Sequence, residues 1–182
     1  MNSANMKHAT FGGGCFWCTE TIFQKIEGVT EVLPGYMGGT KEDPTYEEVW
    51  TGETGHAEVI HIQYDHSKVS FEQLLGMFFK THDPTTLNRQ GNDVGTQYRA
   101  AVFFHDEQQR DITLDFMSKL SAEQVYQEPI VTEVTPAVTF YEAEDYHKDY
   151  FNRNPQNPYC AAVIAPKLTK FLRDYKPQGS DL

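Results

Sequence analysis

We predict an α+β domain in which several helices pack against a mainly antiparallel or mixed sheet. Segments whose apolar residues alternate, as in strands, and segments whose apolar residues recur every three to four positions, as in helices, do not alternate strictly along the chain. The 182 residues are 39% hydrophobic and 13% aromatic, which is enough for one well-buried domain over residues 1–182 and short for two. We expect flexible ends at residues 1–8 and 176–182.

The first predicted element is a helix that begins after three glycines. Apolar residues three and four apart continue to Ile26, and Gly28 ends the helix. A short strand is expected over residues 29–34, followed by a long loop over residues 35–54 that is rich in Gly, Pro, Thr and Tyr. Long loops are uncommon in compact domains unless they have a function.

The next segment, residues 56–65, alternates as a strand does. Counting by twos places Glu58 on the same face as Ile60, Ile62 and Tyr64. A carboxylate on an apolar face either meets a cation or holds a proton, because burial raises its pKa. Glu58 is therefore a candidate general acid, with an ordinary salt-bridged glutamate as the alternative.

The second half of the chain begins with a helix. Ser70 and Gln73 have the spacing of a capping box, and Pro84 stops the helix that they start. The elements expected after it are a polar loop over 85–96, a strand over 98–104, a helix over 107–120, strands near 130–134 and 137–141, and helices over 143–152 and 166–175. Pro155 and Pro158 lie between the last two helices, in a stretch that cannot continue the first of them, so we expect Cys160 on a flexible segment.

Composition and charge limit the partners. A net charge of −11 disfavours nucleic acid and anionic membranes. No apolar run reaches membrane-spanning length, and the first seven residues have no apolar core of a secretory signal. We therefore expect a cytoplasmic protein, and a monomer, since no heptad or large apolar stripe is present. Three cysteines, an odd number, indicate reduced and reactive thiols rather than a disulfide framework.

The stretch GGGCFWCTE, residues 12–20, contains two of the three cysteines. Cys15 is placed at a helix N-terminus, where unpaired N–H groups and the helix dipole favour a thiolate, so we expect its pKa to be lowered. Cys18 lies one turn on, on the same face. The spacing fits a metal half-site, a dithiol or chance; a zinc site needs two more ligands, and Cys160 has no nearby cysteine.

Two aromatic residues, Phe16 and Trp17, stand beside this cysteine. They predict an aromatic-walled pocket for a small apolar group, unless both only fill the core. Gly14-Cys15-Phe16-Trp17 resembles the signature of the peptide methionine sulfoxide reductase A family. Five later segments agree with it: YMGG at 36–39, PTY at 44–46, TGETGHAE at 51–58, HDP at 82–84 and GNDVGTQYR at 91–99. The resemblance covers about residues 10–175 and implies a ferredoxin-like α/β core with extra elements and a long C-terminal coil.

The resemblance also implies the chemistry. The Cys15 thiolate attacks the sulfur of methionine sulfoxide while protonated Glu58 donates to the oxygen. Tyr46 and Tyr98 hydrogen-bond that oxygen, and Asp93 helps to order a water or polar group nearby. Methionine leaves, and Cys15 remains as a sulfenic acid.

The same resemblance implies how substrate is selected and how the thiol is recycled. Phe16 and Trp17 hold the S-methyl group, which selects the S-sulfoxide, free or in oxidised proteins. A second thiol condenses with the sulfenic acid, and thioredoxin reduces the disulfide without a metal or organic cofactor. Cys160 matches the family's resolving position after Asn-Pro-Tyr and is preferred. Many members have Gly in place of Cys18 and two C-terminal cysteines, so Cys18 can compete or accept a relayed disulfide.

Two other functions remain open from the sequence. The first is a general dithiol–disulfide oxidoreductase that uses Cys15 and Cys18, and it leaves Glu58 and the tyrosine-bearing loops without a role. The second is a non-enzymatic zinc-binding module, which would contain stoichiometric metal and unfold with a chelator.

Overall fold

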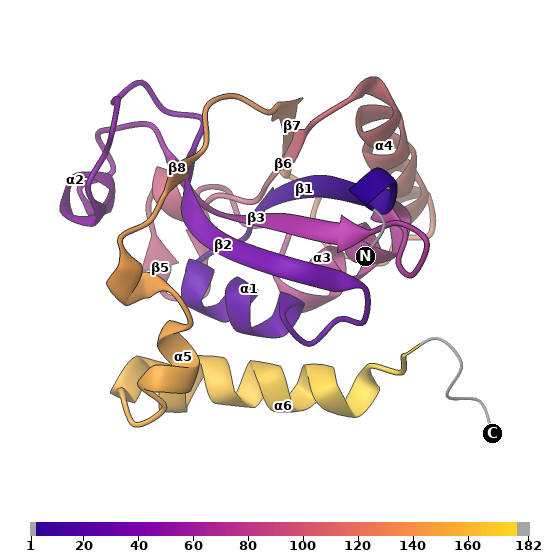
Figure 1. Ribbon diagram of the computed structural model, residues 1–182. Helices are drawn as coiled ribbons and strands as arrows, with labels where there is room; N and C mark the ends of the chain where they lie inside the picture. Colours follow the sequence, from indigo (N-terminus) through magenta and orange to yellow (C-terminus); the bar gives the residue numbers. More distant parts are fainter. Residues whose placement is uncertain (1–2, 178–182) are drawn as a thin grey trace.

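Six strands form one mixed sheet in the computed structural model, which describes residues 3–177 (Figure 1). Their order is β7-β6-β1-β3-β2-β8, and every neighbouring pair is antiparallel except β6 and β7. The strands are β1 (Met6–Gly12), β2 (Val29–Met37), β3 (Ala57–Asp65), β6 (Ala101–Phe104), β7 (Glu133–Pro136) and β8 (Tyr141–Glu142); β4 (Arg89–Gln90) and β5 (Asp93–Val94) form a separate hairpin. The predicted α+β class with a mixed sheet is confirmed.

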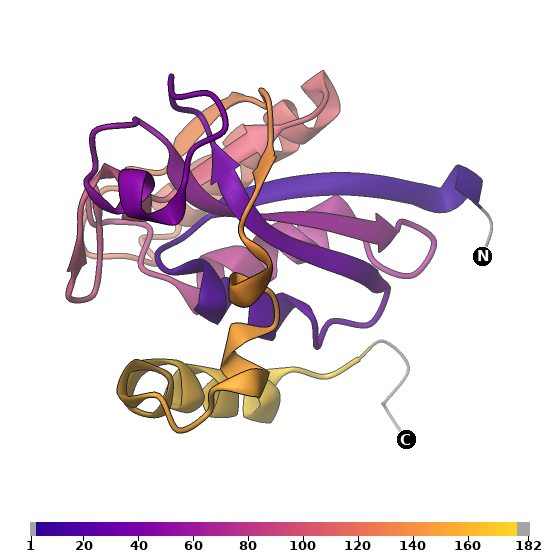
Figure 2. The same ribbon diagram turned by 60° about the vertical axis from the view of Figure 1, so that its left-hand side comes forward.

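Helices cover one face of the sheet, and α1 lies between the sheet and α6 (Figures 1 and 2). The α-helices are α1 (Phe16–Phe23), α2 (Tyr46–Trp50), α3 (Phe71–Thr81), α4 (Glu107–Ala122), α5 (Tyr150–Arg153) and α6 (Ala165–Asp174). The shorter turns are 3-10 helices η1 (Ser3–Asn5), η2 (Thr96–Tyr98) and η3 (Asp145–His147), and a π-helical turn η4 (Cys160–Ile164). None of the helices in residues 3–177 has the length and apolar character needed to cross a membrane.

The centre of the sheet is β1, which the sequence analysis did not predict. Its residues Met6, Lys7 and His8 pair with β3, although they fall in the expected flexible end. Thr10 is buried because its hydroxyl bonds to His61 Nδ1 at 2.8 Å and to His105 Nε2 at 2.9 Å. Such paired polar residues inside the sheet hide the alternation that identifies a strand.

Of the elements predicted for the middle of the chain, one is confirmed and one is wrong in part. The capping box that starts α3 is confirmed: Gln73 N–H donates to Ser70 Oγ, and Ser70 N–H donates to Gln73 Oε1. The loop expected over residues 35–54 is wrong in part, because β2 continues to Met37 and a second capping box, Thr45 with Glu48, starts α2.

The C-terminal segment, residues 137–177, differs most from expectation. The helix predicted over residues 143–152 is wrong: Asp149 has a left-handed φ of 55°, which separates η3 from α5. The segment is not a long coil either, since it ends in η4 and α6. Cys160 is fully buried at the start of η4, which contradicts the expected flexible placement. Of the predicted flexible end at 176–182, residues 178–182 lie outside the described residues.

Candidate functional site

Cys15 occupies the N-cap position of α1, as predicted from the glycines before it. Gly14 has a φ of 84°, and a Cβ at this position would lie 2.7 Å from Gln90 Cγ, so glycine is required there. The Cys15 thiol is half-buried, and all three cysteines are free. The turn thus places one partly accessible thiol at the N-terminus of α1.

Glu58 lies beside this turn on the face of β3 that the alternation predicts. Its side chain is buried, and the Phe16 N–H donates to Glu58 Oε1 at 3.1 Å. Burial raises the pKa of Glu58 to about 8, with a smaller increase from the charge of Asp93, while the Phe16 N–H opposes the shift. The carboxyl group is therefore protonated at neutral pH and can donate a proton.

The expected lowering of the Cys15 pKa is wrong. Burial raises the pKa of the Cys15 thiol well above its usual value, and the nearby Glu58, Cys18 and Asp93 raise it further. The N–H of Trp17 at the helix N-terminus lowers it, as the helix argument requires, but this effect is smaller than the loss of water. Cys15 therefore rests as a thiol beside a protonated acid.

Two tyrosines point their hydroxyl groups into the same region. Tyr46 is the first residue of α2, and Tyr98 is the last residue of η2. Burial raises the pKa of both hydroxyls, and the next largest cause for each is the charge of Glu58, with Cys15 also contributing. Both tyrosines therefore stay neutral donors next to Cys15 and Glu58.

Asp93 is tied to a tyrosine that the sequence analysis missed. The Tyr159 hydroxyl donates to Asp93 Oδ2 at 2.6 Å, and burial raises the pKa of Tyr159, with Cys15 as the next cause. The signal was available, since Tyr159 directly precedes Cys160. Asp93 thus joins the β4–β5 hairpin to the C-terminal segment beside the thiol.

The two aromatic residues of the signature have different positions: Phe16 lies in the core, and Trp17 lies at the surface of the site. Phe16 is fully buried against Tyr36 and so fills the core, whereas Trp17 remains half-exposed. The Trp17 ring stacks on Tyr150 at 3.8 Å, and its Nε1–H donates to Nδ1 of the buried His147 at 2.9 Å. His147 carries no pattern that identifies it in the sequence, because its contact with Trp17 joins residues far apart in the chain.

The two other thiols are both buried. Cys18 raises the pKa of Cys15, which identifies it as a close neighbour. Burial raises the pKa of Cys18 to about 11, with Lys167 opposing the shift. Burial also raises the pKa of Cys160. Neither second thiol is poised as a thiolate in this state.

The histidines of the sheet serve structural contacts. His56 Nδ1 accepts the Gly39 N–H at 3.0 Å, and its Nε2 lies 2.7 Å from the Lys41 carbonyl. His61 bonds to Thr10, as described above. Within residues 3–177, no group of three or more His, Cys, Asp or Glu side chains is arranged to hold a metal ion.

Comparison with known proteins identifies the family. The family model for peptide methionine sulfoxide reductase matches residues 7–179. The chain belongs to the peptide methionine sulfoxide reductase family. It is therefore an oxidoreductase, and the reductase resemblance of its sequence motifs is confirmed.

Individual relatives span nearly the whole chain. Peptide methionine sulfoxide reductase MsrA 1 of Rhodopirellula baltica is 54% identical over 174 residues, which are 94% of this chain and 90% of the relative. The reduced form of Mxr1 from Saccharomyces cerevisiae has a TM-score of 0.81 and 32% identity, covering 87% of this chain and 91% of that one. Mxr1 in complex with Trx2 has a TM-score of 0.57 and 22% identity over 82% and 87% of the two chains, which supports the fold alone.

Proposed function

We propose that this family member is a peptide-methionine (S)-S-oxide reductase in which Cys15 and Glu58 carry out the reaction. The observation that carries the proposal is the buried Glu58, held by the Phe16 N–H beside the half-buried Cys15 thiol. Sulfoxide reduction needs a nucleophile for sulfur and a proton for oxygen, and a carboxyl group with a pKa of about 8 supplies that proton at neutral pH.

In the first step, Cys15 sulfur attacks the sulfoxide sulfur while the sulfoxide oxygen accepts the Glu58 proton. The resulting Glu58 carboxylate takes up the proton that the Cys15 thiol loses. Because the pKa of both groups is raised, each group holds its proton until the substrate reacts. In net terms one oxygen atom is transferred: the Cys15 thiol becomes a sulfenic acid, and methionine sulfoxide becomes methionine. Tyr46 and Tyr98 donate hydrogen bonds to the oxygen, and Asp93 orders the polar side of the site.

The aromatic wall fits selection of the S-methyl group. Trp17 is held by Tyr150 on one face and by His147 through its Nε1–H, so its ring has one orientation. In this proposal the Trp17 ring contacts the methyl group and the tyrosine hydroxyls bind the oxygen, which distinguishes the two substituents. This arrangement supports a preference for the S epimer, with Phe16 shaping the pocket from behind.

Recycling requires a second thiol and a reductant. Cys18 is close enough to Cys15 to raise its pKa, whereas Cys160 is fully buried at the start of η4. We propose that the sulfenic acid condenses with one of these thiols, releasing water, and that thioredoxin reduces the disulfide. The burial of Cys160 speaks against a freely moving thiol, so in this proposal Cys18 is the first partner and Cys160 can receive a relayed disulfide.

The proposed cycle needs no further components. All the groups named come from one chain, so a monomer is sufficient, and neither a metal nor an organic cofactor has a step to perform. Free thiols and a thioredoxin-dependent cycle require a reducing compartment such as the cytoplasm. Both free methionine sulfoxide and oxidised proteins are substrates in this proposal.

A reaction without added reductant tests the proposal. Fully reduced protein is mixed with methionine S-sulfoxide, and methionine release is measured together with a thiol count and a peptide mass map. Without relay, about one methionine per chain and a disulfide to Cys15 are expected. Relay to Cys160 leaves a Cys18–Cys160 disulfide and a free Cys15, which releases a second methionine. Cys15→Ser should release none. No methionine from the folded, reduced protein would exclude the reductase mechanism.

The mass map also separates the two resolving thiols. A Cys15–Cys18 disulfide that is absent in Cys18→Ser supports the neighbouring thiol, while a Cys15–Cys160 disulfide supports movement of η4. Because Cys15 and Cys18 are neighbours, a general dithiol–disulfide activity is the alternative. It predicts reduction of an insulin disulfide at a rate that does not depend on Glu58.

A further inference from the structure

A carboxylate outside the reacting pair, Glu144, contacts the site from the C-terminal segment. It directly precedes the 3-10 turn η3 and is half-buried. The Tyr36 hydroxyl donates to its Oε1 at 3.0 Å, and the Tyr46 N–H donates to its Oε2 at 3.0 Å. The Tyr146 hydroxyl makes a longer bond to Oε2, at 3.4 Å. Each carboxylate oxygen of Glu144 therefore holds a tyrosine that lies at or beside the site.

The first of these tyrosines, Tyr46, begins α2. An N–H in the first turn of a helix has no partner within that helix, and Glu144 supplies the missing acceptor for Tyr46. His147, at the end of η3, packs against the Tyr46 ring with the two centroids 4.3 Å apart. One short turn of the C-terminal segment thus contacts both the backbone and the ring of Tyr46.

The second tyrosine, Tyr36, is part of the sheet. It is fully buried on β2 and lies directly opposite Glu58 in the pairing of β2 with β3. Its ring packs on Phe16 with the centroids 5.7 Å apart, and the Phe16 N–H is the donor that holds Glu58. Glu144 therefore links the first residue of α2 to the strand next to the acid.

This link matters because α2 cannot hold its own position. The helix has five residues, of which only Val49 is buried, and helices this short are unstable without contacts to other elements. A displacement of about 1 Å in a catalytic group can lower a reaction rate by about a hundredfold. The place of the Tyr46 hydroxyl relative to Glu58 therefore depends on the contacts that anchor the start of α2.

We propose that Glu144 is a positioning residue for sulfoxide reduction, which holds the Tyr46 backbone and the Tyr36 hydroxyl together so that the Tyr46 hydroxyl meets the sulfoxide oxygen beside Glu58. The proposal rests on the reductase function proposed above. Glu144 does not contact the substrate in this scheme and acts through Tyr46. A carboxylate suits the role because its two oxygens accept two donors at once.

The test is a double-mutant cycle on the first step alone. Fully reduced protein is mixed with saturating methionine S-sulfoxide, and the rate constant of methionine formation is measured in a single turnover, so that neither a resolving thiol nor thioredoxin affects it. Glu144→Ala and Tyr46→Phe should each slow this step about tenfold. The double variant should be no slower than Tyr46→Phe, because the hydroxyl that Glu144 positions is already absent.

A conservative variant separates geometry from charge. In Glu144→Gln the amide oxygen can accept the Tyr46 N–H, and the amide N–H can donate to the Tyr36 hydroxyl oxygen. The rate constant should therefore stay within about threefold of wild type, whereas Glu144→Ala loses both bonds. A loss in Glu144→Gln as large as that in Glu144→Ala would mean that the charge matters rather than the link, and would overturn the proposal.

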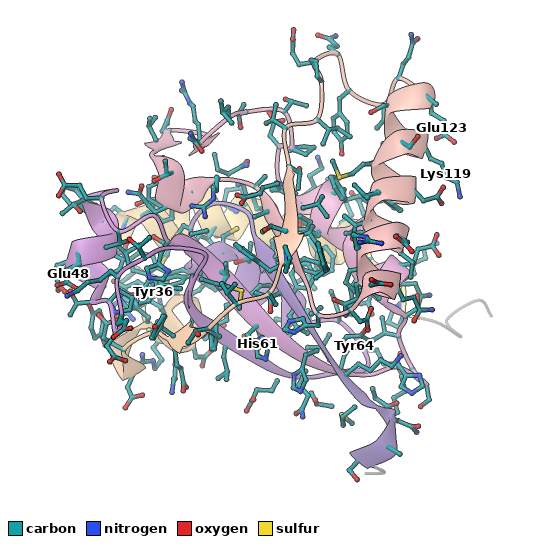
Figure 3. All side chains as sticks on the ribbon, turned by 90° about the horizontal axis from the view of Figure 1, so that it is seen from above. Tyr36, Glu48, His61, Tyr64, Lys119 and Glu123 are labelled. Atoms are coloured by element: carbon teal, nitrogen blue, oxygen red, sulfur yellow. The ribbon has the colours of Figure 1, made fainter. Side chains whose placement is uncertain are left out.

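Glu48 provides the matched control. Its Oε2 accepts the N–H of Thr45, the residue before Tyr46, at 2.9 Å, so Glu48→Ala also removes a hydrogen bond from the start of α2. Figure 3 shows Glu48 at the outer edge of the molecule, with Tyr36 further in. Glu48→Ala should change the rate constant less than about twofold, because the link from Tyr46 to Tyr36 remains.

The other outcomes are also decisive. Equal losses in Glu48→Ala and Glu144→Ala would reduce the role of Glu144 to the stability of α2 and overturn the proposal. An unchanged rate in Glu144→Ala, or a double variant whose loss is the product of the two single losses, would overturn it as well. No methionine from the wild-type protein would instead contradict the proposed reductase function.

Discussion

The site is assembled from two regions with different construction. Cys15 and Glu58 are held by regular structure, the N-cap of α1 and the buried face of β3, and one hydrogen bond from the Phe16 N–H joins them. Tyr159, His147 and Cys160 come from the C-terminal segment, whose backbone contains a left-handed Asp149 and a π-helical turn. The reacting pair thus has a rigid support, while the aromatic wall and one candidate resolving thiol are supported by irregular structure that can rearrange.

A substitution at Glu58 should have the strongest consequence for catalysis by the Cys15–Glu58 pair. Glu58→Gln keeps the size of the side chain but removes the proton, so kcat should fall by a factor of about 10² to 10⁴. Because the pKa of Glu58 is about 8, the kcat of wild type should decline as pH rises through that value, and the variant should lose this decline. An alkaline decline that persists in Glu58→Gln would assign the acid to another residue.

The next effect tests the backbone that carries the thiol. Gly14→Ala forces a Cβ onto the Gln90 side chain at a φ of 84°, so a loss of about 1–3 kcal/mol in unfolding free energy is expected, with a large loss of kcat. Gly91→Ala is the control, because its φ is 58° but nothing lies within 4 Å of the added Cβ. It should lose about 1 kcal/mol and keep kcat. Equal effects of the two variants on kcat would mean that the turn does not position Cys15.

A third prediction concerns the contact between α1 and the C-terminal segment. Glu20, buried on α1, accepts the Asp149 N–H at 2.9 Å, and burial raises its pKa from 4.5 to about 7. The native state therefore binds this proton more tightly than the unfolded chain does. The contribution of Glu20 to stability should fall as pH rises from about 4.5 to 7 and level off above. Glu20→Gln should remove this decrease of about 3 kcal/mol in the free energy of unfolding, measured by chemical denaturation at several pH values.

The control for this experiment is Glu72→Gln, at an exposed glutamate of α3. It should leave the dependence of unfolding free energy on pH unchanged. If Glu20→Gln has the same slope as wild type, Glu20 is not the group that links α1 to the C-terminal segment electrostatically.

The weakest effect is expected for the local stability of η4, which the Tyr159–Asp93 hydrogen bond supports. Tyr159→Phe removes the hydrogen bond to Asp93, and about 1 kcal/mol of local stability should be lost. Amide hydrogen exchange in residues 160–164 should then accelerate about fivefold, without a similar change in α3. Tyr126→Phe, which removes a hydrogen bond to the Phe79 carbonyl, is the matched control and should not affect η4.

Elements with local sequence patterns were predicted correctly from the residues alone. The capping box of Ser70 and Gln73, the alternation that buries Glu58 and the glycine turn before Cys15 each depend on residues a few positions apart. The motifs around Cys15 and Tyr98 were also sufficient to identify the family. Regular structure and family membership were therefore readable from the printed residues.

The environment of the thiols depends on contacts between distant parts of the chain. Whether Cys15 has a lowered or raised pKa depends on the water removed by β3, the tyrosines and the C-terminal segment, and these contacts join residues far apart in sequence. The same holds for His147 beside Trp17 and for the burial of Cys160. Local patterns report backbone preferences, whereas desolvation and long-range packing are properties of the folded chain.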